Sequence, residues 1–152
     1  MSPRAACRLE SLGFRAVYDY VPGKSDWLAR GLPTEGTQAA TRRAHDLARA
    51  DVVRAALTDP VEEVAEHLAD SAYPFALVVS EQGTLLGRLP RSIIERSAGK
   101  EAGEVMEAGP STIRADTDAA KLLERLRAQN LRFALVTTPE GKLTGVVRRD
   151  DL

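Results

Sequence analysis

The chain has 152 residues, of which 43% are hydrophobic and 28% are charged, which is enough to bury the core of one compact domain. Its 21 basic and 22 acidic side chains are scattered, so the sequence lacks the basic stripe that nucleic-acid binding requires. The longest apolar run, residues 75–79, is far shorter than the roughly 20 residues of a membrane-spanning helix, and we predict no membrane segment.

The first element that the sequence predicts is a helix over residues 2–12, which contains the single cysteine, Cys7. A reactive thiolate needs a lowered pKa and exposure, and residues 5–9 offer no loop of backbone amides that would lower the pKa. Cys7 is therefore interpreted as an ordinary helical cysteine. Because a lone cysteine forms no internal disulfide, we expect a reducing, cytoplasmic location.

Residues 37–50 form the next predicted element, a weakly amphipathic linker helix in which alanine and leucine are interspersed with arginine and aspartate. His45 lies in this helix and is interpreted as a surface residue. His67 is the only other histidine, so we expect no metal site.

An internal repeat organises the rest of the chain. The tetrapeptide Phe-Ala-Leu-Val occurs at residues 75–78 and again at residues 133–136, an offset of 58. Three more pairs keep this offset without a gap: Gly83 and Gly141, Leu85 and Leu143, Gly87 and Gly145.

Each copy predicts an amphipathic helix, an apolar strand, a turn with glycine, a second strand and a short helix. Asp59 and Pro60 are expected to begin the first amphipathic helix, with Asp59 as its cap, and Thr117 is expected to cap the second. The apolar faces of the two helices have the spacing i, i+3, i+4, i+7. They comprise Val61, Val64, Ala65 and Leu68 in the first copy, and Ala119, Leu122, Leu123 and Leu126 in the second.

These elements predict an α/β (α+β) fold class with two β-hairpin-plus-helix repeats. One hairpin and one helix cannot cover both of their apolar faces, so we expect the copies to pack on each other about a pseudo-twofold axis. The predicted divisions are an N-terminal segment at 1–36, the linker helix at 37–50, a first motif at 51–96 and a second motif at 97–152.

The repeats resemble a tandem pair of CBS domains over roughly residues 45 to 152. The resemblance is carried by Glu-Val-Met at 104–106, Ser-Thr-Ile at 111–113, Ala-Leu-Val-Thr at 134–137, Gly-Lys-Leu-Thr-Gly-Val-Val at 141–147 and Asp-Asp-Leu at 150–152. It implies that residues 51–96 and 97–152 are the first and second CBS motifs.

The resemblance also implies that an adenine nucleotide or a related adenosyl compound binds in a cleft between the repeats. Asp151 would accept the ribose hydroxyls and Arg148 would bind phosphate. Pro90 and Ile93 replace the matching hydroxyl and carboxylate in the first motif, so we expect at most one functional site per chain. The full set of predicted ligand-binding residues is Thr112, Ile113, Phe133, Ala134, Arg148 and Asp151.

Each of these residues also has a purely structural interpretation. Asp151 can be a helix N-cap, Arg148 a solvated side chain, and Phe133 and Ala134 parts of the core.

A second resemblance covers roughly residues 2–36, which are similar to the C-terminal third of a rhodanese domain. It is carried by Leu12-Gly13-Phe14, Gly23-Lys24, Trp27-Leu28 and Gly31-Leu32-Pro33. In that family the active-site cysteine lies in an anion-binding loop before the helix that residues 2–12 would form, so Cys7 does not match it. We interpret residues 1–36 as a rhodanese-like C-terminal remnant.

Our leading hypothesis is therefore a regulatory CBS-pair module that binds an adenosyl nucleotide of the AMP, ATP or S-adenosylmethionine type and that is not an enzyme. The alternative is a ligand-free dimerisation or scaffold module with a degenerate site. A third is a decayed sulfurtransferase accessory segment. We also expect a homodimer, formed through helix faces such as Val61/Val64/Leu68 and Leu122/Leu123/Leu126, and no resident cofactor.

Overall fold

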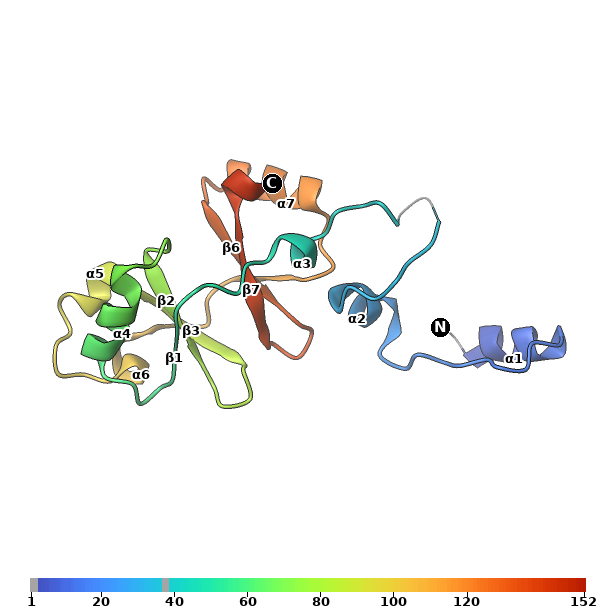
Figure 1. Ribbon diagram of the computed structural model, residues 1–152, viewed down its shortest axis with the longest axis horizontal. Helices are drawn as coiled ribbons and strands as arrows, with labels where there is room; N and C mark the ends of the chain where they lie inside the picture. Colours follow the sequence, from blue (N-terminus) through green and yellow to red (C-terminus); the bar gives the residue numbers. More distant parts are fainter. Residues whose placement is uncertain (1–2, 37–38) are drawn as a thin grey trace.

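The computed structural model describes residues 3–36 and 39–152, and its elements follow the repeat (Figure 1). The helices are α1 (Pro3–Ser11), α2 (Gly23–Ala29), α3 (Ala44–Leu47), α4 (Val61–Ala69), α5 (Arg91–Ile94), α6 (Ala102–Val105) and α7 (Ala119–Ala128), with a 3-10 turn, η1, at Arg149–Asp151. The strands are β1 (Arg54–Ala55), β2 (Phe75–Val79), β3 (Leu85–Pro90), β4 (Glu107–Ala108), β5 (Thr112–Arg114), β6 (Phe133–Thr137) and β7 (Leu143–Arg148).

Each repeat contains one small mixed sheet. The first has the order β1-β2-β3-β4 and the second the order β5-β6-β7. In both, the first two strands run parallel and the hairpin is antiparallel, with Phe75 opposite Pro90 in one and Phe133 opposite Arg148 in the other. The predicted α/β class and the two hairpin-plus-helix repeats are confirmed.

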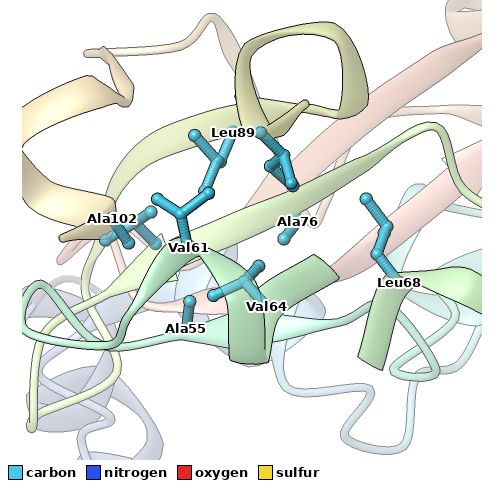
Figure 2. Close-up of a cluster of buried hydrophobic side chains, with 9 residues drawn as sticks. Ala55, Val61, Val64, Leu68, Ala76, Leu89 and Ala102 are labelled. Atoms are coloured by element: carbon cyan, nitrogen blue, oxygen red, sulfur yellow. The ribbon is translucent and has the colours of Figure 1, made fainter. Parts of the chain in front are cut away.

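The predicted helix faces form the two repeat cores. In the first repeat, Val61, Val64 and Leu68 of α4 point towards Ala76 and Leu89 of the hairpin (Figure 2). In the second, Leu122 and Leu126 of α7 pack against β6 and β7 in the same way. Because five of these helical side chains are buried inside the chain itself, our expectation that they expose an apolar surface for dimerisation is wrong.

The two repeats meet in a third core whose contacts are reciprocal. The amide of Leu85 donates to the carbonyl of Gly141 at 3.0 Å, and the amide of Leu143 donates to the carbonyl of Gly83 at 2.9 Å. The rings of Phe75 and Phe133 pack edge to face with centroids 5.4 Å apart. Reciprocal bonds between positions offset by 58 are what a local twofold axis produces.

A short segment ahead of each repeat packs on the outer strand of a hairpin. α6 and β4 lie along β3, whereas α3 leads to Arg49, which bridges to Val146 of β7. The segment before the first repeat therefore completes the second sheet. A helix was expected over residues 37–50, but the only helix found among the described residues of this range is the short α3. After α3 the chain is extended along β7. Residues 37–38 lie outside the described residues.

Both predicted helix caps are wrong by one position. Pro60, not Asp59, precedes α4, and the Asp59 carboxylate accepts a hydrogen bond from the amide of Ala56 at 2.8 Å instead. In the second repeat Asp118, not Thr117, caps α7 by accepting from the amide of Ala120 at 2.9 Å.

The N-terminal region packs far less than the repeats. α1 has no buried residue, and Cys7 on it is exposed (Figure 1). α2 is better anchored: Asp26 accepts hydrogen bonds from Arg30 and Tyr20, which lower the pKa of its carboxyl. In the part of the chain that the structure describes, no helix is long and apolar enough to cross a membrane.

Candidate ligand grooves at the repeat interface

An open groove of about 350 Å³ lies where the two repeats meet. Phe75 and Arg88 line it from the first repeat, and Leu131 and Phe133 line it from the second. Its walls combine apolar and aromatic side chains with the opposite charges of Arg88 and Glu107. Such a groove suits a flat ring that carries an anionic group.

A smaller cavity of about 140 Å³ adjoins the open groove, and Phe133 and Leu131 line both. Four of the predicted ligand-binding residues line this cavity, and the structure therefore brings them together. They are Thr112, Ile113, Phe133 and Ala134.

Arg88 is the residue of the open groove that sequence reasoning missed. Its guanidinium donates to Glu107 at 2.7 and 3.1 Å and lies 5.9 Å from the centre of the Phe75 ring. Both side chains of the Arg88–Glu107 pair are close to half exposed, and such pairs contribute only about 1 kcal/mol or less. An incoming anion can therefore compete with Glu107 for Arg88. The repeat does contain a sequence signal for this residue, because the equivalent position of the second copy, 58 residues later, has the apolar Val146 in place of a charged side chain.

The position related to the open groove by the twofold axis is closed by side chains of the chain itself. Tyr73, which is equivalent to Leu131 in the repeat, occupies this position, and its hydroxyl donates to Asp51 at 2.8 Å. The Arg148 guanidinium lies over the Tyr73 ring, 4.7 Å from its centre, and 3.9 Å from the Asp51 carboxylate. Burial of Tyr73, together with its bond to Asp51, raises the pKa of its hydroxyl.

Asp151 is held at the same closed groove. Arg49 donates to both of its carboxylate oxygens at 2.8 Å, and this bidentate contact raises the pKa of Arg49. Arg148 and Asp151 are thus engaged by Asp51, Tyr73 and Arg49, and they line neither the open groove nor its side cavity. The predicted ligand set is divided between the two sides of the repeat interface.

Within residues 3–36 and 39–152, no three histidine, cysteine, aspartate or glutamate side chains gather in a way that could hold a metal ion.

Comparisons with known proteins agree with this architecture. The model of the CBS domain matches residues 102–152. The cytosolic domain of the Mg2+ channel MgtE in complex with ATP is 26% identical with a TM-score of 0.65; the match covers 74% of this chain and only 49% of that one. No curated protein sequence matches.

Two further solved structures have the same fold. The CBS domains of a transcriptional regulator from Streptococcus pneumoniae are 18% identical with a TM-score of 0.64, and the match covers 72% of this chain and 95% of that one. A CBS domain protein from Pyrobaculum aerophilum complexed with AMP is 22% identical with a TM-score of 0.60, over 73% and 90% of the two chains. Residues 102–152 thus match the CBS domain model, and the chain has the fold of a tandem pair of CBS domains.

Proposed function

We propose that this chain is a regulatory module that binds an adenosyl nucleotide, of the AMP, ATP or S-adenosylmethionine class, in the open groove between its two repeats. The observation that carries the proposal is the groove itself, with aromatic walls from both repeats and an arginine at its side. Two proteins of similar fold were solved with ATP and with AMP. A ligand that contacts both repeats would stabilise their packing, which is how occupancy would be transmitted.

The side chains around the groove suit the parts of a nucleotide. The base would pack on Phe133 and Leu131, next to the backbone of Thr112 and Ile113. The phosphate would take the place of Glu107 on Arg88, where a guanidinium can donate two hydrogen bonds. Ala134, which lines the side cavity, leaves room for the ring.

Arg148 and Asp151 have a different part in this proposal. A ribose contact from Asp151 would require Arg49 to let go of both oxygens, and a phosphate contact from Arg148 would require it to leave Tyr73. We therefore assign these two residues to the second, closed groove.

Calorimetric titration with AMP, ATP and S-adenosylmethionine tests the proposal. We expect binding by at least one of them and an affinity about tenfold or more weaker in Arg88→Gln, because a hydrogen bond to a charged group contributes about 1.5–3 kcal/mol. Arg114→Gln is the matched control, since Arg114 is an exposed arginine paired with an aspartate, Asp116, and lines neither the groove nor its side cavity. Equal binding by both variants would contradict the assignment of Arg88.

The alternative is a ligand-free dimerisation or scaffold module, and the closed second groove favours it. If no nucleotide produces heat or shifts the melting temperature, the alternative is preferred. The homodimer remains a proposal that sedimentation tests; a monomeric mass at micromolar concentration would contradict it.

Three further predictions belong with this proposal. The family match begins at residue 102, so the rhodanese-like remnant at residues 1–36 stays a prediction. The cytoplasmic location rests on the single cysteine. The absence of enzymatic activity rests on the lack of a nucleophile paired with a base among the sequence motifs. A cyanide-dependent thiosulfate assay tests the third hypothesis, a decayed sulfurtransferase segment, and turnover that is lost in Cys7→Ser would support that hypothesis.

A further inference from the structure

Five side chains at the closed groove form one charge-balanced cluster, which has no counterpart at the open groove. Two arginines, two aspartates and one tyrosine take part. The repeat equivalents show the contrast: Arg148 and Asp151 correspond to Pro90 and Ile93, neither of which can form an ion pair. The cluster comprises Arg49, Asp51, Tyr73, Arg148 and Asp151.

Tyr73 is the side chain that fills the space. It is 1% exposed, whereas Leu131, at the equivalent position of the open groove, is 44% exposed. Its ring packs against Phe75 and Phe133 with centroids 5.9 and 5.8 Å away, and Arg148 covers it on another side. A base could stack at this position only after the tyrosine had moved.

Arg49 links the closed groove to the segment before the first repeat. Its amide and carbonyl exchange hydrogen bonds of 2.9 Å with Val146, which adds the chain before the first repeat to the edge of β7. Its guanidinium reaches on to Asp151, 102 positions away in the sequence. The contact that occupies Asp151 therefore adds to the bonds that fasten this segment to the second repeat, which include those from the amides of Ala44 and His45 to the carbonyls of Thr117 and Ala115.

We propose that the five side chains form a latch: it closes the second groove, so that the chain binds one nucleotide, and it holds Arg49 on the edge of β7. The single-nucleotide part rests on the proposed function above, and the anchoring part does not. Opening the latch would both uncover a second groove and loosen Arg49 from the edge of β7. The latch thus couples the repeat interface to the edge of the second sheet.

Amide hydrogen exchange at Arg49 and Val146 tests the anchoring without any ligand. In Asp151→Asn the charged partner of Arg49 is lost, and we expect both amides to exchange about tenfold faster or more. Glu107→Gln is the control, because it removes the carboxylate from an arginine pair on the sheet of the first repeat, and we expect less than a twofold change. Unchanged exchange in Asp151→Asn would overturn the anchoring.

Stoichiometry tests the closure. Wild type is expected to bind about one AMP per chain in calorimetry, and Tyr73→Leu, which gives the closed groove the residue of the open one, about two. Tyr73→Phe keeps the ring and is expected to remain at one. If Tyr73→Leu folds and still binds one AMP, the closure is wrong; if it does not fold, a value of two in Arg148→Gln supports the closure and a value of one overturns it.

The two proposals can fail separately. A wild type that binds no AMP, ATP or S-adenosylmethionine contradicts the proposed function, while faster exchange in Asp151→Asn still supports the anchoring. Suppose instead that the wild type binds AMP, that amide exchange in Asp151→Asn is unaltered and that Tyr73→Leu still has a single site. These results would support the proposed function and contradict the latch.

Discussion

Equivalent positions of the two repeats are alike in the cores and different at the grooves. Leu68 and Leu126 are 1% and 2% exposed, each under its own sheet. Tyr73, by contrast, is 1% exposed and its equivalent Leu131 is 44% exposed. Every sheet needs an apolar helix face to cover it, so packing imposes the same requirement on both cores. A groove has no such requirement, and here one side is filled by the chain while the other is left open.

The same contrast holds for charges. The two arginines are similarly exposed, but Glu107 is 47% exposed and accepts from Arg88 through one oxygen, whereas Asp151 is 23% exposed and accepts from Arg49 through both. The repeats thus share a scaffold, and their polar residues decide what each side of the interface can do.

If the two cores are equivalent, matched truncations should have matched effects. Leu68→Ala and Leu126→Ala each remove a buried side chain under a sheet, and we expect each to lower the free energy of unfolding by about 3 kcal/mol. Urea unfolding at neutral pH measures both. A cost below about 1 kcal/mol for one of them would show that its repeat is not packed as described.

A smaller effect should separate the segments that lie on the two hairpins. A Cβ at Gly145 would come 2.5 Å from the carbonyl oxygen of Arg49, which is fixed by the bridge to β7. A Cβ at Gly87 would meet mainly the thioether end of Met106, a flexible side chain. We expect Gly145→Ala to destabilise by about 2 kcal/mol and Gly87→Ala by about 1 kcal/mol or less. The order of the two urea midpoints checks this, and the reverse order would contradict it.

The sequence predicted the elements whose signals are local or repeated. The offset of 58, the strands at residues 75–79 and 133–137 and the apolar faces of α4 and α7 all follow from spacing alone. The caps were missed by one residue because Thr117 and Asp118 both offer a capping oxygen, and because Asp59 lies one residue too early and accepts from Ala56 instead; only the backbone geometry shows where each helix begins.

The site was predicted less well for a physical reason. Thr112 and Ala134 are brought to one cavity by neighbouring strands of one sheet, which a repeat pattern can anticipate. The separation of Asp151 from them depends on Arg49, which reaches it through tertiary packing and not through any local pattern. The role of Arg88 likewise depends on how two sheets face each other.

The amphipathic helices themselves begin differently, which gives a third test. Asp118 accepts hydrogen bonds from the amides of Ala120 and Lys121, whereas Pro60 at the equivalent position of α4 accepts none through its side chain. Asp118→Ala should therefore cost about 1 kcal/mol of stability. Asp118→Ser keeps a capping oxygen and should cost only a few tenths. Equal melting temperatures for Asp118→Ala and the wild type would exclude the cap as a source of stability.

The smallest expected effect depends on pH and belongs to the first repeat alone. The amide of Gly99 donates to the Glu62 carboxylate at 2.6 Å, and this bond lowers the pKa of Glu62. At the equivalent position the second repeat has Ala120, so α7 lacks this contact.

Because the folded-state pKa of Glu62 lies below the unfolded one, its contribution to stability is present above the ordinary glutamate pKa of about 4.3 and is lost as the pH falls through the folded-state value. Glu62→Gln should therefore have a lower urea midpoint than the wild type at pH 7, and the two midpoints should converge on acidification towards about pH 3. A difference that stays constant over this range would mean that the carboxylate charge has no part in holding residue 99 against α4. The wild type and the variant share every other carboxylate, so their difference isolates this one bond from the acid sensitivity of the remaining protein.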